Sequence, residues 1–253
     1  RALLVRENAK TAALQESEKL HTALFSSLSH DLKTPLASIT GAVTTLRQLG
    51  SRMKQGSRDD LLLSIEEEAG RLTRFVSNLF DMTRIEAGTL KAKNNPVDAA
   101  DAIASAIERM KKLKPGVMID TSIAPDLAIV SGDSGLLDQV LFNLLDNAAK
   151  YGGESPIAVY AKNDAGRVTV SVTDQGKGIP EKDLDRIFEK FYRRIKNDGR
   201  AAGTGLGLSI ARGFIETMGG TIRAESPAIR KRGTRFIISL PTFDKTGSGA
   251  AGP

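Results

Sequence analysis

The sequence contains no cysteine and no tryptophan, and it has no long apolar run. Without cysteine, the chain can form no disulfide, no thiolate metal site and no cysteine nucleophile. No stretch approaches the ~18 consecutive apolar residues that span a bilayer. A P-loop pattern, G-x-x-x-x-G-K-S/T, is also missing, and the glycine-rich segment 203–208 ends in leucine where the dinucleotide pattern needs glycine. These absences predict a soluble globular protein that uses neither of those two nucleotide folds.

The chain also has little excess charge of one sign. Its 253 residues carry a formal net charge of +6, to which residues 1–95 and 96–253 contribute equally. Because the excess is not concentrated, it favours a mildly basic soluble protein over a nucleic-acid-binding one. The first residue is Arg rather than Met, so we expect an upstream region.

Apolar residues recur every three or four positions from about residue 14 to residue 88, which is the helical period. A polar, glycine-containing gap at 50–57 divides this pattern in two and predicts a helical hairpin. Two helices with one apolar seam each bury that seam best when two hairpins form a four-helix bundle. We therefore expect a homodimer.

Turn residues at 93–96 end the helical pattern, and helical and strand-like segments alternate beyond them. The predicted helices are 97–113, 133–150 and 205–219, and the predicted strands are 117–123, 127–130, 156–161, 167–173, 221–224 and 235–240. The fold class is therefore α+β, a helical hairpin followed by an α/β two-layer sandwich. The expected divisions are a linker helix at 1–13, the hairpin domain at 14–90, a hinge at 91–96, the second domain at 97–243 and a flexible tail at 244–253.

The segment from Ser29 to Pro35 places a histidine beside a carboxylate on the first helix. His30 and Thr34 are one turn apart and share a face, with Asp31 next to them. A neutral imidazole has an unprotonated nitrogen that can attack an electrophile, and a neighbouring carboxylate stabilises the charge that develops. By itself, however, a surface histidine beside an aspartate is ordinary.

A second group of polar residues follows on a later helix. Asn143, Asn147 and Lys150 fall on one helical face, opposite the apolar side of the same segment. Two amide oxygens and an ammonium group suit a hydrated Mg²⁺ ion with its polyphosphate. A merely solvated helix face is the alternative at this point.

Two glycine-rich segments complete the pattern. Asp174 ends a strand and enters Gly176-Lys-Gly178, where the backbone must approach another group closely or adopt a positive φ. A buried carboxylate there can accept a hydrogen bond from an adenine amine. In Gly203–Leu208 the glycines precede a helix, so that free amides and the positive helix end face a phosphate group.

Together these segments resemble the boxes of the sensor histidine kinases, and the likeness covers nearly all of residues 20–241. The matching segments are 29–35 for the H box, 143–151 for the N box, 174–180 for the first glycine box, 188–191 for the F box and 203–208 for the second glycine box. Several boxes in order are far more specific than any one of them. The amino-acid sequence of residues 28–35 and 81–88 is similar to that of the potassium-responsive KdpD-type kinases in particular.

The resemblance implies a dimerisation and histidine-phosphotransfer domain followed by an ATP-binding domain of the Bergerat (GHKL) type. His30 would accept the γ-phosphoryl group of ATP, with Asp31 orienting and deprotonating it, and would pass the group to an aspartate of a response regulator. Thr34 would position water when the same bundle dephosphorylates the regulator.

ATP and Mg²⁺ are the implied cofactors. Asn147 would coordinate Mg²⁺ with Asn143 assisting, and Asp174 would read the adenine amine. The other implied nucleotide contacts are Lys150, Tyr151, Gly176, Gly178, Phe188, Gly203, Thr204, Gly205, Leu206 and Gly207. We expect no nucleic-acid partner. We expect this chain to be the cytoplasmic portion of an inner-membrane-anchored sensor, which contacts the membrane only through an upstream segment.

Two other functions remain open. An ATP-driven conformational clamp of the same ATPase fold would hydrolyse ATP without forming a phosphoprotein, and His30 in its seven-residue context argues against it. A catalytically silent dimeric scaffold would bind partners through the hairpin, and the intact Asn147 and Asp174 argue against that.

Overall fold

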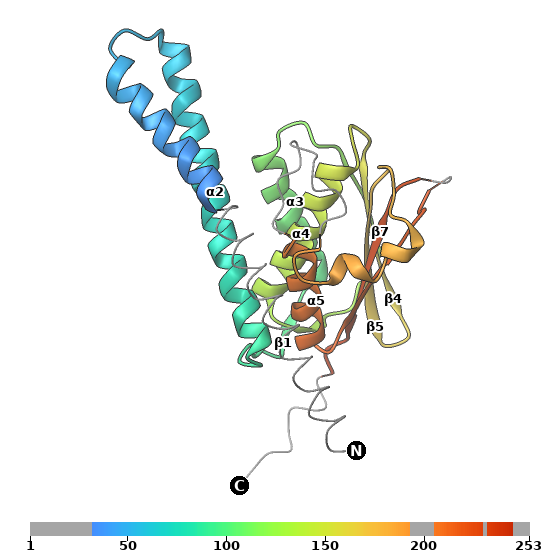
Figure 1. Cartoon of the computed structure of the whole chain (residues 1–253). Helices are drawn as coiled ribbons and strands as arrows, with labels where there is room; N and C mark the ends of the chain where they lie inside the picture. Colours follow the sequence, from blue (N-terminus) through green and yellow to red (C-terminus); the bar gives the residue numbers. More distant parts are fainter. Residues whose placement is uncertain (1–31, 193–204, 230–231, 245–253) are drawn as a thin grey trace, which may run out of the picture. The chain divides into compact units, whose positions relative to one another are not determined.

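The computed structural model describes residues 32–192, 205–229 and 232–244 (Figure 1). The chain divides into two compact units between Ser77 and Asn78. Within the described residues, no helix is both long enough and apolar enough to cross a membrane.

The first unit is a helical hairpin, as the sequence predicts. Its first helix is described from residue 32 to residue 49, and a turn leads into α2 (Gln55–Glu86), whose last residues belong to the second unit. Ala42 and Phe75 are buried, whereas the neighbouring apolar residues Val43 and Val76 are exposed. One hairpin therefore covers only part of its own apolar surface.

The second unit is a two-layer sandwich of a five-stranded sheet and three helices, which confirms the predicted fold class. The strands lie in the order β2 (Ile119–Ile123), β4 (Ile157–Asp164), β5 (Arg167–Thr173), β7 (Arg235–Pro241) and β6 (Thr221–Glu225). The β2–β4 pair is parallel and the other pairs are antiparallel. The helices α3 (Ala99–Leu113), α4 (Ser134–Tyr151) and α5 (Gly207–Thr217) cover one face of the sheet (Figure 1).

Alternation along the strands explains why the helices cover only one face. In β4 the side chains of Ile157, Val159 and Ala161 are buried, while the residues between them are exposed. Such a period of two places every second side chain against the helical layer. Two short 3₁₀ turns, η1 (Glu181–Asp183) and η2 (Arg186–Phe188), follow the end of β5.

One short strand was not predicted. Residues 93–96 read as turn residues, but β1 (Asn95–Val97) pairs antiparallel with β3 (Val130–Gly132) in a separate two-stranded sheet. Pro96 has no amide to donate, which favours a turn or an edge position from sequence alone. In a two-stranded pair every strand is an edge, so the missing donor can be tolerated.

The start of α4 is fixed by Asp133. Its backbone is extended, and its Oδ1 accepts hydrogen bonds from the amides of Gly135 at 3.0 Å and Leu136 at 3.2 Å. These are two of the amides that a helix start leaves without an internal partner. The cap thereby sets where the helix that carries Asn143 and Asn147 begins.

We predict that Asp133→Ala lowers the free energy of unfolding by about 1 kcal/mol, because both amides lose their acceptor. Asp133→Ser keeps an acceptor oxygen and should recover most of that loss. Urea denaturation followed by circular dichroism measures the difference. Equal destabilisation by the alanine and serine variants would contradict a capping role.

Candidate nucleotide-binding site

The polar face of α4 lies against the start of α5. Asn143 and Asn147 are partly buried, and the Nδ2 of Asn143 donates to the carbonyl oxygen of Gly207 at 3.4 Å. On the opposite side of α4, Leu144 and Ala148 are buried in the core. The stripe predicted from the sequence is therefore partly enclosed and faces a second element of the proposed site.

Asp174 is the buried carboxylate that the sequence predicts at the end of β5. Its side chain is 4% exposed, and its Oδ1 accepts hydrogen bonds from the amides of Gly176 at 2.7 Å and Thr234 at 3.3 Å. Burial raises the pKa of the Asp174 carboxyl, and the two amide bonds oppose that rise. A carboxylate held in this way is suited to accept a hydrogen bond from a ligand in a low-dielectric site.

The first glycine turn crosses the C-terminal end of α4 at very short range. A Cβ added at Gly176 would lie 2.1 Å from the carbonyl oxygen of Tyr151, and one added at Gly152 would lie 3.0 Å from the Cβ of Asp174. Gly178 has a φ of +73°, which glycine adopts at little cost. The sequence predicts a close approach or a positive φ for this turn. Gly176 shows the close approach, and Gly178 shows both, since a Cβ there would lie 2.7 Å from the Oγ of Ser226.

The second glycine segment leads directly into α5. Gly205 has a φ of +69°, and its carbonyl oxygen accepts a hydrogen bond from the amide of Phe191 at 3.0 Å. Leu206 is fully buried at the N-cap and supplies no side-chain cap. The amides of the first turn, which begins at Gly207, have no carbonyl partner within the helix, so this end of α5 suits an anion.

Three residues predicted to contact the nucleotide also make contacts within the protein. Phe188 is buried and packs edge-to-face on Phe236, with ring centroids 6.3 Å apart, so the structure places it in the core. Lys150 forms an ion pair with Asp146 at the edge of the site. Tyr151 exposes its ring, while its carbonyl oxygen faces Gly176.

Several predicted residues lie outside the described ranges, namely His30, Asp31, Gly203 and Thr204. Thr34 lies within them, exposed on the first helix of the hairpin.

Sequence reasoning missed the segment that holds Asp174 in place. Thr234 both donates to the Asp174 carboxylate and accepts the Asp174 amide, at 2.9 Å, through its carbonyl oxygen. Gly233 donates its amide to the carbonyl oxygen of Gly176 at 2.8 Å. A Gly-Thr pair just before the last strand was the available signal, but only the pairing of β5 with β7 shows what it contacts.

The donor set suits Mg²⁺ bound together with phosphate. Within the described part of the chain, no group of three or more His, Cys, Asp or Glu residues is arranged so that it could hold a metal ion. Mg²⁺ commonly takes few protein oxygens and completes its shell with phosphate and water. The amide oxygens of Asn143 and Asn147 fit that mode.

Two family models match the chain. The one described as "Histidine kinase-, DNA gyrase B-, and HSP90-like ATPase" matches residues 132–244, and the one described as "His Kinase A (phospho-acceptor) domain" matches residues 20–88. The second range includes all of the predicted H box, and the first includes the N box and both glycine boxes.

Curated relatives and solved structures agree with these matches. Sensor protein KdpD of Clostridium acetobutylicum is 35% identical over 95% of this chain and 27% of the relative. The histidine-protein kinase/phosphatase MprB of Mycolicibacterium paratuberculosis is 32% identical over 97% of this chain and 48% of the relative. The chain thus spans between about a quarter and a half of the length of these relatives.

Among solved structures, the mycobacterial sensor histidine kinase MprB is 32% identical over 59% of this chain and 97% of the other, with a TM-score of 0.52. Full-length ShkA in complex with AMPPNP is 25% identical over 86% of this chain and 45% of the other, with a TM-score of 0.62.

We predict that Gly176→Ala weakens ATP binding roughly 10- to 100-fold, because the new methyl group collides with a backbone oxygen that cannot rotate away. Gly56→Ala is the matched control, since a Cβ there meets nothing within 4 Å. Equilibrium binding of a fluorescent ATP analogue measures both. Unchanged affinity in Gly176→Ala would show that the turn and α4 can separate without loss of the site.

Proposed function

The chain belongs to the histidine kinase family, and from that premise we propose that it is the kinase core of a two-component sensor, autophosphorylating on His30. The observation that carries the proposal is the arrangement around one end of the α4 helix. A buried carboxylate, a stripe of amides and an open helix start lie on neighbouring elements, each matched to one part of Mg²⁺-ATP.

The adenine end of the nucleotide is proposed to lie at Asp174. Its carboxylate is buried and already accepts two backbone amides through Oδ1, and the other oxygen is proposed to accept the adenine amine. Hydrogen bonds to an ionised group in a site of low dielectric are strong, which favours adenine over a base without the amine.

The phosphate end is proposed to lie between α4 and the start of α5. Asn147 would hold Mg²⁺ with Asn143 assisting, and the metal would neutralise charge on the phosphate oxygens. The first-turn amides of α5 from Gly207 would bind phosphate oxygens. Lys150 is paired with Asp146 in the structure and would exchange part of that pairing for a phosphate contact.

The proposed reaction transfers one phosphoryl group twice. The unprotonated ring nitrogen of His30 attacks the γ-phosphorus, an N–P bond forms, and the bond to the β,γ-bridging oxygen breaks with release of ADP. Asp31 accepts the ring proton. A carboxylate oxygen on the response regulator then attacks phosphorus, the N–P bond breaks with its electron pair left on the ring nitrogen, and Asp31 returns the proton to the ring. Such transfers depend mainly on positioning and charge neutralisation.

The proposed partners are a second copy of the chain and the receiver domain of a response regulator. Large apolar side chains remain exposed on the hairpin at Leu36, Val43, Leu62, Leu63 and Val76. They are proposed to be covered when two hairpins form a four-helix bundle. Regulator dephosphorylation is proposed as a second activity, as the name of the kinase/phosphatase MprB records for that relative.

The sensor region is proposed to lie outside the 253 residues of this chain. The chain spans 27% of the KdpD relative, which leaves ample length for a sensor region there. Membrane anchoring and a potassium stimulus remain predictions that rest on the resemblance.

We predict that incubation with Mg²⁺ and γ-labelled ATP yields an acid-labile, alkali-stable label on the protein, the signature of phosphohistidine. The label should be absent in His30→Gln and in Asn147→Asp. The matched controls are His21→Gln, the chain's other histidine, and Asn94→Asp, an exposed residue far from α4 in sequence. Label on Ser or Thr would contradict the proposal, and ATP turnover without label would favour the conformational clamp.

We predict further that Thr34→Ala keeps autophosphorylation but slows dephosphorylation of the regulator about 100-fold, because the attacking water loses its orientation. Thr44→Ala is the control, because Thr44 lies on the same helix but outside the 29–35 segment. The two rates are measured separately with purified phosphorylated regulator. Equal loss of both activities in Thr34→Ala would refute this division of roles.

A further inference from the structure

We infer that Ser226 is a positioning residue for adenine recognition, because its hydroxyl holds the first glycine turn in the shape that presents Asp174. The inference rests on the proposed function, since it assumes that Asp174 reads the adenine. Ser226 follows β6 directly and lies far from the turn in sequence.

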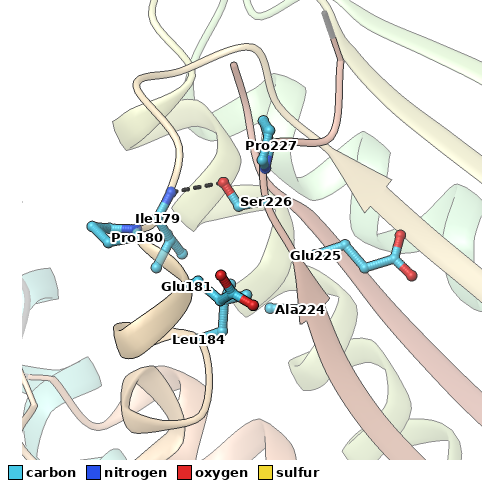
Figure 2. A pocket seen from close by; sticks show the side chains of 8 residues that line it. All are labelled: Ile179, Pro180, Glu181, Leu184, Ala224, Glu225, Ser226 and Pro227. Carbon is cyan, nitrogen blue, oxygen red and sulfur yellow. Dashed lines mark hydrogen bonds between the residues drawn. The ribbon is translucent and has the colours of Figure 1, made fainter. Parts of the chain in front are cut away.

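The hydroxyl of Ser226 connects two backbone segments. The amide of Ile179 donates to its Oγ at 2.8 Å, and the hydroxyl donates to the carbonyl oxygen of Gly233 at 2.9 Å. Figure 2 shows the first of these bonds as the dashed line between Ile179 and Ser226. A hydroxyl offers one donor and two acceptor positions, and here it uses both functions at once.

Two glycines allow the three segments to meet. A Cβ at Gly178 would lie 2.7 Å from the Oγ of Ser226 and 3.3 Å from the carbonyl oxygen of Gly233. A Cβ at Gly233 would lie 2.2 Å from the carbonyl oxygen of Asp174. The serine hydroxyl therefore lies where the turn and the 233–234 segment are in backbone contact.

The chain of bonds continues from Gly233 to the carboxylate. Gly233 donates to the carbonyl oxygen of Gly176, and Thr234 bonds Asp174 through both its amide and its carbonyl oxygen. A shift of the segment held by Ser226 would therefore move the group that is proposed to accept the adenine amine. Ser226 itself bonds Ile179, at the far end of the turn, so it acts through the backbone and not by touching the base.

The outer side of this contact is open. A pocket of about 680 Å³ borders Ser226 (Figure 2), and its lining residues are Ile179, Pro180, Glu181, Leu184, Ala224, Glu225, Ser226 and Pro227. Side chains that line a pocket make fewer van der Waals contacts on that side than side chains in a filled core do. On this side the two hydrogen bonds of Ser226 therefore supply part of what holds the turn.

The test compares ATP binding and turnover in variants of the full chain. We expect Ser226→Ala to raise the Kd and the KM for ATP about tenfold, the effect of two lost hydrogen bonds, with kcat at saturating ATP unchanged. The phosphate end keeps all of its residues, which is why turnover should persist. Ser226→Thr keeps the hydroxyl and should stay within about twofold of the parent protein.

Base selectivity distinguishes positioning from general support. Inosine triphosphate carries a carbonyl oxygen where ATP has the amine, so Ser226→Ala should weaken ATP binding more than inosine triphosphate binding. Ser239→Ala is the matched control, because it also removes a hydrogen-bonded hydroxyl, one that accepts from Nε of Arg167 at 2.8 Å. It should leave both affinities unchanged.

Three outcomes would each overturn the inference: equal weakening of the binding of both nucleotides in Ser226→Ala, a fall in its kcat, or unchanged ATP binding.

Two further variants, Ser226→Val and Asp174→Asn, keep the outcomes separate. Ser226→Val has the same shape as Ser226→Thr but lacks the hydroxyl, so comparing these two decides the question if the alanine variant does not fold. Asp174→Asn tests the premise. If it leaves ATP binding intact, the proposed adenine contact fails; if it weakens ATP binding while Ser226→Val matches Ser226→Thr, only the role of Ser226 fails.

Discussion

The site depends on a close approach of two backbones, where the first glycine turn crosses the end of α4. No side chain fits between them, because a Cβ at Gly176 would lie 2.1 Å from the carbonyl oxygen of Tyr151. This contact places the end of β5, with Asp174, beside the helix that carries Asn147. Residues proposed for the base and for the metal thus share one rigid frame although about 30 residues separate them in sequence.

The sandwich supplies that frame and separates the elements that are proposed to hold the two ends of the nucleotide. α4 and α5 both bury one side against the sheet and leave their polar features at the edge of the helical layer. Asn143 joins the helices by its bond to the carbonyl oxygen of Gly207. The base is proposed to contact residues that follow β5, and the phosphates are proposed to contact residues of α4 and α5. Substitutions at the two places can therefore affect nucleotide affinity and turnover separately.

Local patterns in the sequence predicted most of this, and long-range pairing accounts for what they missed. Helical spacing was enough to place Asn143 and Asn147 on one face, and the end of a β-rich run before a glycine turn was enough to single out Asp174. Thr234 was missed because its role depends on the register between β5 and β7, which no local pattern contains. Phe188 was expected at the nucleotide, but its contact with Phe236 shows that a motif residue can shape a site from within the core.

The burial of Asp174 has a consequence for proton uptake and release. Burial raises the pKa of this carboxyl, because the charged form is poorly solvated at the end of β5. A ligand amine that donates to the charged form favours it and so lowers the pKa. In the proposed complex, binding and ionisation are therefore thermodynamically linked. At pH values between the pKa of the free and that of the bound carboxyl, the nucleotide would expel a proton as it enters, and its affinity would rise with pH across that interval.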